Sequence, residues 1–170
     1  IASTTKAINL ALKYSSRLHI LHISTAEEVE LLRKARLQSD RITGEVCIHH
    51  LWFSDSDYEK YGSLIKCNPA IKSSSDREAL RQALREGVIS VVATDHAPHL
   101  LSEKETPYLK SPSGIPLVQH SLRAMLELVR SGVFTSTDVV RLMSHSPADC
   151  FKISRRGFLK KGYFADITIV

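Results

Sequence analysis

The sequence has few of the features that mark secreted, membrane-spanning or nucleotide-binding proteins. Its three cysteines, Cys47, Cys67 and Cys150, are an odd number without CxxC spacing. That pattern argues against a disulfide framework or a zinc ribbon and favours a reducing, cytoplasmic setting. The apolar runs are far shorter than the ~18 residues that cross a membrane. No GxGxxG or P-loop motif is present either. What remains is a globular domain whose chemistry depends on individual side chains.

Positive charge is in modest excess and is dispersed along the chain. Lysine and arginine number 23 against 18 aspartates and glutamates, which gives a net charge of +5. A nucleic-acid-binding surface needs clustered basic residues interleaved with aromatic ones. Here the basic residues cluster only in short groups such as Arg155-Arg156, and aromatic residues make up 6% of the chain. We therefore do not expect nucleic acid as a partner, and the short apolar runs argue against a membrane as one.

Strand-like and helical segments alternate along the chain. Strands are expected at 18–23, 42–48 and 88–94. Helices are expected at 4–16, after a cap at Ser24 or Thr25, between a Ser75–Glu78 capping box and Gly87, at 116–132, and at 135–144. This order implies parallel strands joined by right-handed crossovers, as in α/β proteins.

Polar residues gather where the expected strands end. His22 lies at the end of the first strand, His49 and His50 follow the second, and Asp95 and His96 follow the third. Strand alternation would turn His49 and His50 to opposite faces, as ligands or as structural residues. An open sheet and a (β/α)8 barrel both fit the order of elements, but reactive residues at several strand ends are typical of the barrel. We therefore expect part of a barrel.

The densest group of reactive side chains is the segment ATDHAPH at 93–99. A carboxylate, Asp95, and two imidazoles, His96 and His99, at the mouth of a buried strand can bind a metal or transfer protons. Pro98 restricts the backbone and should hold His99 in a defined direction. The alternative is that Asp95 caps the loop and the histidines are solvated.

Three further positions are candidates, each with a structural alternative. His22 stands beside a helix cap and could be a metal ligand, although a histidine on a strand is commonly a core residue. Asn68 lies in a loop between strand and helix, where its amide could bind a polar substrate or shape a turn. The backbone of the segment Ser111-Pro112-Ser113-Gly114 could offer amides to an anion, or the segment could be an ordinary loop.

These residues resemble a known family. The segment ATDHAPHLLSEK at 93–104 resembles the signature of dihydroorotases, in which A-T-D-x-A-P-H is followed shortly by a lysine. Other segments agree in order and spacing: HILHIST at 19–25, EVCIHHLWFS at 45–54, KCNPAIKSSSDREAL at 66–80, SPSGIPLVQHSL at 111–122 and GYFADITIV at 162–170. The resemblance covers essentially the whole chain and points to the C-terminal part of a class I dihydroorotase, in the amidohydrolase superfamily.

The resemblance implies a fold and a metal centre. The fold is a distorted (β/α)8 barrel with a two-zinc centre, other divalent metals being alternatives, and a small β-domain built from both chain ends. Residues 1–156 would hold about strands six to eight, and residues 157–170, ending in the strand-like ADITIV, would begin the β-domain. His22 would bind the second zinc, while Asp95 would bind the first and act as general acid and base.

The resemblance also implies substrate contacts. Asn68 and His99 would touch the substrate, with His99 near its carboxylate, and the backbone of Ser113 and Gly114 would touch the ring. His49 and His50 are typical of the family but are not implied as ligands. The sequence departs from the family at Lys72, where many members have arginine. A lysine binds an anion as a point charge without the bidentate fork, which puts an anion contact there in doubt.

The function implied is reversible hydrolysis of dihydroorotate to N-carbamoyl-aspartate in pyrimidine biosynthesis. The family's strand-one His-x-His pair, strand-four bridging ligand and strand-five histidine would lie upstream of Ile1. We therefore expect this chain alone to be inactive, because His22 and Asp95 are fewer than the three ligands of a catalytic zinc. The alternatives are a hydantoinase- or allantoinase-like amidase and a non-catalytic scaffold domain. Homodimerisation, or association with another enzyme of the pathway, is expected.

Overall fold

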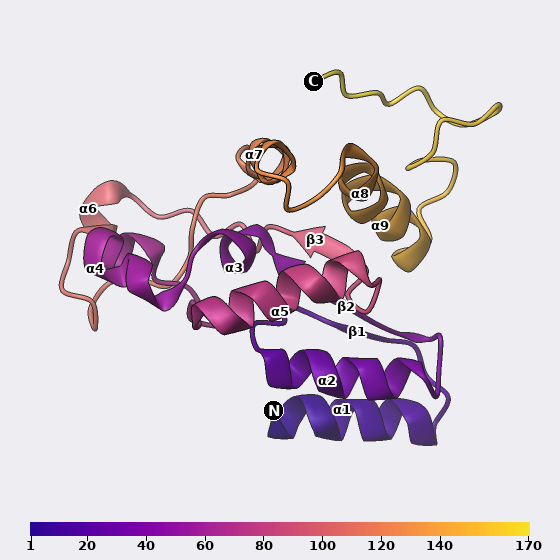
Figure 1. The fold of residues 1–170 in the computed structure, drawn as a ribbon, viewed down its shortest axis with the longest axis horizontal. Helices are drawn as coiled ribbons and strands as arrows, with labels where there is room; N and C mark the ends of the chain where they lie inside the picture. Colours follow the sequence, from indigo (N-terminus) through magenta and orange to yellow (C-terminus); the bar gives the residue numbers. More distant parts are fainter.

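A computed structural model describes all 170 residues, and its centre is a three-stranded parallel sheet (Figure 1). The strands are β1 (Leu18–Ile20), β2 (Ile42–Cys47) and β3 (Val91–Ala93), side by side in the order β1-β2-β3. Leu18 pairs with Ile42, and Cys47 pairs with Ala93. All three carboxyl ends therefore meet at one edge of the sheet. The parallel arrangement expected from the sequence is confirmed.

The two faces of the sheet differ in chemistry. On β2 the residues Ile42, Gly44 and Val46 are buried, whereas Thr43 and Glu45 between them are half-buried. Ile42 and Val46 belong to one hydrophobic core that also includes residues of the surrounding helices. Gly44 is required by this packing, because a Cβ there would lie 2.5 Å from Ile23 Cδ1 and 2.8 Å from Leu32 Cδ2.

Helices cover the apolar face (Figure 1). Those before and between the strands are α1 (Ala2–Lys13), α2 (Ala26–Arg36) and α5 (Ser74–Arg85). Helix α2 begins at the expected cap, with Thr25 Oγ1 accepting from the Glu28 amide. The expected box at Ser75 and Glu78 is wrong. The cap of α5 is Ser73, whose side chain accepts from the Asp76 amide, so the helix starts two residues earlier than expected.

The strands are shorter than the sequence predicts, and short helices fill the segment after β2. His22 stands just beyond β1 instead of within it, and Asp95 follows β3 as expected. Residues expected to be irregular form α3 (Ile48–Trp52), the 3-10 turn η1 (Asp55–Asp57), α4 (Tyr58–Tyr61) and η2 (Gly62–Ile65). His49 and His50 therefore lie on a helical turn, and the expectation that strand alternation separates them is wrong.

The helices after β3 also differ from expectation. They are α6 (Leu101–Lys104), α7 (Ser121–Arg130), α8 (Ser136–Val140), the π-helical turn η3 (Arg141–His145) and α9 (Ser146–Cys150). Helix α7 does not start at Pro116, because residues 116–120 form an extended piece and a turn. The last helix runs on to Cys150, since Pro147 occupies its first turn, where a missing N–H has no cost.

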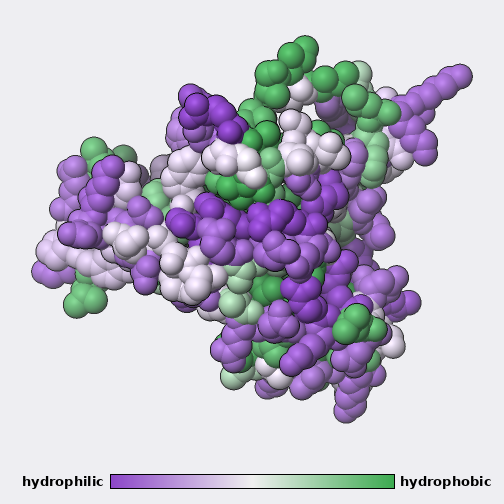
Figure 2. Space-filling model, viewed as in Figure 1, coloured by the Kyte–Doolittle hydropathy of each residue, from purple (hydrophilic) through white to green (hydrophobic).

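The expected strand ADITIV is not formed. Residues 165–170 have no regular structure and are exposed, and no other strand lies beside them to complete a ladder. Figure 2 shows apolar surface along this C-terminal segment, to which Ile167, Ile169 and Val170 contribute. The division into units at 1–156 and 157–170 stays a prediction. No helix is both long and apolar enough to cross a membrane.

Candidate metal and substrate site

Two predicted metal ligands stand at the carboxyl edge of the sheet. His22 follows β1 and Asp95 follows β3, and both have positive φ, 40° and 45°. Left-handed backbone in a residue other than glycine costs on the order of 1 kcal/mol and persists only where the surrounding structure enforces it. Neither side chain hydrogen-bonds within the chain, so both keep free lone pairs. The structure thus brings the two to one edge, on the two outer strands.

A cluster of buried histidines stands between them, at the end of β2. His49 and His50 are 1% and 2% exposed, and their ring centroids are 4.3 Å apart. His50 Nε2 donates to the Pro69 carbonyl at 3.0 Å. Burial lowers the pKa of His49 to about 3 and that of His50 to about 4. Both rings are therefore neutral near pH 7.

Electrostatic effects connect this cluster to the flanking residues. The positive charge of His22 when protonated contributes to the low pKa of both buried histidines. The pKa of the Cys47 thiol is raised, mainly by burial and then by the carboxylates of Glu45 and Asp95. Burial raises the pKa of Cys67 to about 11, and Asp95 adds to this. The carboxyl edge is therefore one electrostatically connected group.

The loop after β3 brings three of the predicted substrate residues together. His99 Nε2 donates to the Ser113 carbonyl at 3.1 Å, and His99 Nδ1 lies 3.9 Å from Glu103 Oε2. Gly114 has φ +141°, and a Cβ there would lie 2.5 Å from the Ala97 carbonyl oxygen. Only glycine allows this close approach, which holds the 111–114 loop against the 95–99 loop.

Lys104 fixes this pair of loops to a third one. Its side chain is 5% exposed, and Nζ donates to the carbonyls of Lys66, Pro112 and Gly114 at 3.0, 2.9 and 3.0 Å. Burial lowers the pKa of this ammonium. Sequence reasoning noticed Lys104 as part of the signature but gave it no role. The fixed spacing between the ATDHAPH motif and a lysine was the available signal.

Replacing Lys104 by methionine should release these loops. The three carbonyls would lose their shared donor. The Lys66 carbonyl keeps the Gly114 amide, but those of Pro112 and Gly114 are left without a strong donor in a buried place. Each unsatisfied group costs about 1–3 kcal/mol, partly recovered by water entry. We expect a loss of about 3 kcal/mol in the free energy of unfolding, measured by urea denaturation. Lys110→Met, an exposed control on the same loop, should change it by less than about 0.5 kcal/mol. Equal stability of the two variants would contradict this role.

Asn68 reaches the site from the third loop but contacts none of the other predicted residues by a hydrogen bond. It is exposed and lies between Cys67 and the cis peptide bond to Pro69. Lys72, the departure from the family, turns back on its own loop, since Nζ donates to the Ala70 carbonyl at 2.9 Å. The structure thus gives its charge a local partner in place of a free anion site.

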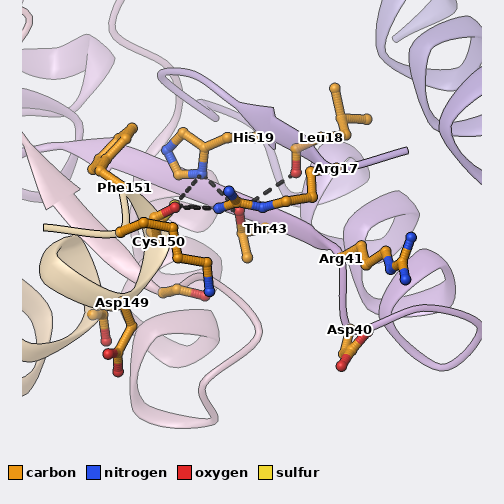
Figure 3. A pocket seen from close by; sticks show the side chains of 12 residues that line it. Arg17, Leu18, His19, Asp40, Arg41, Thr43, Asp149, Cys150 and Phe151 are labelled. Carbon is orange, nitrogen blue, oxygen red and sulfur yellow. Dashed lines mark hydrogen bonds between the residues drawn. The ribbon is translucent and has the colours of Figure 1, made fainter. Parts of the chain in front are cut away.

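A pocket lies at the opposite edge of the sheet, at the amino ends of the strands. It encloses about 810 Å³, and Figure 3 shows Cys150 and Phe151 from the end of the helical C-terminal part beside His19 and Thr43. His19 Nδ1 lies 2.8 Å from Thr43 Oγ1, and its Nε2 lies 3.0 Å from Glu45 Oε2. None of the predicted site residues lines it. His19 therefore lines the pocket at the amino ends of the strands, whereas His22 lies at their carboxyl ends.

The donor set at the carboxyl edge fits zinc in kind. Zinc takes imidazole nitrogen and carboxylate oxygen, and His22 and Asp95 offer one of each, with no competing hydrogen bond. Three ligand atoms of Cys47, His49 and His50 also lie within 4.8 Å of one another. Within this chain, the two residues that the resemblance implies as ligands are fewer than the three of a catalytic zinc site.

Comparisons with known proteins agree with this picture. The model of the amidohydrolase family matches residues 6–170. A dihydroorotase of Endomicrobium trichonymphae is 39% identical over 167 residues, which are 98% of this chain and 40% of that protein. One of Methanosphaera stadtmanae is 36% identical over 170 residues, covering 100% of this chain and 39% of the relative.

Solved structures give the fold. An L-hydantoinase (dihydropyrimidinase) from Arthrobacter aurescens matches with a TM-score of 0.87 and 28% identity, over 95% of this chain and 38% of that one. A dihydropyrimidinase from Brevibacillus agri matches with a TM-score of 0.86 over 95% of this chain and 37% of that one. At 24% identity this match shows the fold alone. The chain spans about two-fifths of the length of these relatives. Together with the family match, these similarities show that the chain belongs to the amidohydrolase family.

Proposed function

We propose that this chain is the C-terminal part of a cytoplasmic, zinc-dependent dihydroorotase, which interconverts dihydroorotate and N-carbamoyl-aspartate in pyrimidine biosynthesis. The observation that carries the proposal is the ATDHAPH segment at 93–99, at the carboxyl edge of a parallel sheet, in a chain whose relatives at 35–40% identity are named dihydroorotase. The complete protein would close the sheet into an eight-stranded barrel. It would act as a homodimer or with another enzyme of the pathway.

Two residues of this chain would hold the metal. His22 would supply an imidazole nitrogen and Asp95 a carboxylate oxygen, both from the same edge of the sheet. When bound, zinc polarises a carbonyl oxygen and lowers the pKa of a bound water, and this is the chemistry that hydrolysis of a ring amide requires. The remaining ligands would come from the part of the protein outside this chain.

Asp95 would move the proton. Its carboxylate is exposed and has no hydrogen-bond partner, so it can take a proton from the attacking water. The same oxygen can then give that proton to the ring nitrogen as the C–N bond breaks. The reverse reaction uses the same two transfers in the opposite order, which suits a reversible ring closure.

The loops would bind the rest of the substrate. His99 Nε2 is taken by the Ser113 carbonyl, so the substrate carboxylate would accept from protonated Nδ1. The Gly114 amide donates to the Lys66 carbonyl at 2.9 Å, and the Gly114 carbonyl accepts from Lys104. This leaves the Ser113 amide as the free backbone donor for the ring, and the exposed Asn68 side chain would supply a further polar contact.

A related cyclic amidase is the second candidate. The structural match to a hydantoinase at a TM-score of 0.87 favours it, because the two activities open similar rings. The two differ in the carboxylate that dihydroorotate carries and hydantoin lacks. His99 is therefore the residue of this chain that would separate them.

The test compares ring opening of dihydroorotate, hydantoin and allantoin by the intact, zinc-loaded protein. We expect kcat/KM for dihydroorotate to exceed the other two by at least about 100-fold, as expected where a site pairs with a substrate carboxylate. Chelation should abolish turnover, and zinc should restore it. Preference for hydantoin or allantoin would replace this proposal with the second candidate. No turnover of any of the three by the zinc-loaded protein would favour a scaffold domain.

A further inference from the structure

We propose that Cys47, His49 and His50 form a second cation site, selective for a thiophilic divalent ion such as zinc, beside the site of His22 and Asp95. It is built at one junction, where β2 ends at Cys47 and α3 carries both histidines in its first turn. One ligand atom from each residue lies within 4.8 Å of the other two. Small rotations of the three side chains would bring them to the bond lengths of a zinc centre, about 2.0–2.3 Å.

The buried nitrogens of the cluster lack partners. His49 Nδ1, His49 Nε2 and His50 Nδ1 are all inaccessible to solvent and make no hydrogen bond. Buried polar atoms in proteins are nearly always paired, and an unpaired group points to a bound water, an ion or a functional role. A cation bound beside the Cys47 thiol would pair two of these atoms, one on each ring.

The tautomer of His50 is already the one that a metal needs. Its Nε2 donates to the Pro69 carbonyl, so Nδ1 carries the lone pair and faces no competing donor. Ligating histidines commonly donate their other ring N–H to a backbone carbonyl in this way, which fixes the orientation of the ring. His49 has both nitrogens free and can present either one.

The chemistry of the donors selects the ion. One sulfur and two imidazole nitrogens suit zinc and other thiophilic ions, whereas magnesium and calcium require oxygen ligands. The carboxylates of Glu45 and Asp95, which act on the Cys47 thiol, make the surroundings favourable to a cation. Binding would form the metal–sulfur bond and release the thiol proton to solvent, with no change of oxidation state. A fourth position would stay open, as in three-ligand zinc sites.

Cobalt titration of the metal-free 170-residue chain tests this site. Co²⁺ is the probe because a cobalt–thiolate bond gives a charge-transfer band in the near ultraviolet, which the imidazole and carboxylate of His22 and Asp95 cannot produce. We expect the band to saturate at one equivalent of cobalt. Zinc added afterwards should displace it. Absence of the band in the unmodified chain would overturn the proposal, whatever the variants do.

Matched variants assign the sulfur. Cys47→Ser and Cys47→Ala should lose the band, while Cys67→Ser, which removes the other buried thiol near Asp95, and Cys150→Ser should keep it. His50→Gln should weaken cobalt affinity at least about 10-fold, and Asp95→Asn should leave the band in place. Circular dichroism of each variant checks that it folds. A band that survives in both Cys47 variants, or that disappears in Cys67→Ser, would overturn the assignment. Either result leaves the proposed dihydroorotase activity untouched.

Discussion

Asp95→Asn in the intact protein is expected to lower kcat/KM for dihydroorotate by at least about 10³-fold. An amide cannot accept the proton of the attacking water, and general acid–base catalysis by a positioned side chain contributes about 10²–10⁴-fold. An amide is also a weaker metal ligand, which adds to the loss. The substitution should not disturb the fold, because Asp95 is exposed and asparagine tolerates its φ of 45° equally well.

The matched control for this variant is Asp149→Asn. Asp149 is an exposed aspartate at the other end of the sheet, where it lines the pocket around His19. The Asp149→Asn variant should retain the activity of the unmodified protein within about twofold, because residue 149 touches neither the predicted ligands nor the substrate loops. Steady-state kinetics and zinc content of both variants are the measurements. If Asp95→Asn kept a tenth or more of the activity, the proton-transfer role of Asp95 would be wrong.

Acidification should unfold this chain through its two buried histidines. Their folded pKa values, about 3 for His49 and about 4 for His50, lie below the ordinary value of 6.5 because burial disfavours the charged ring. Above pH 6.5 neither the folded nor the unfolded state binds these protons. As the pH falls below 6.5, the unfolded chain binds two protons that the folded chain does not bind. The free energy of unfolding therefore decreases as the pH decreases.

The size of this effect is large for one domain. One pKa unit is worth about 1.4 kcal/mol, so each histidine should cost ~3 kcal/mol at pH 4. Whole domains are stable by only about 5–15 kcal/mol. We therefore expect the free energy of unfolding, measured by urea denaturation with a chelator present, to fall steeply between pH 6 and 4.

Two substitutions separate this cause from general acid effects. His49→Leu and His50→Leu should each make the free energy of unfolding less dependent on pH. Between pH 6 and 5 the slope should fall by ~1.4 kcal/mol per pH unit, the value for one proton, whatever the substitution does to stability at pH 7. His120→Gln is the control, since that ring is exposed in the folded chain and should leave the slope unchanged. A slope unaltered in both leucine variants would show that other groups drive the acid transition.

Local patterns predicted the framework of this fold well. The β-branched run at 88–94 and the cap at Thr25 depend on a few neighbouring residues, and the structure has a strand and a helix there. Errors arose where distant contacts decide. Ser73 caps α5 because Asp76 also accepts from the Ala26 amide, fifty residues away. The C-terminal ADITIV has the composition of a strand but no neighbour with which to pair.

The sequence by itself determined the family, the parallel order of the strands and the candidate residues His22 and Asp95, because these depend on motifs and on hydrophobic periodicity. Only the tertiary structure placed Lys104 under three carbonyls of separate loops, and only it brought Cys47, His49 and His50 into one buried cluster. Both features result from packing. Whether a polar side chain finds a partner or stays without one depends on groups that the chain brings together only when it folds.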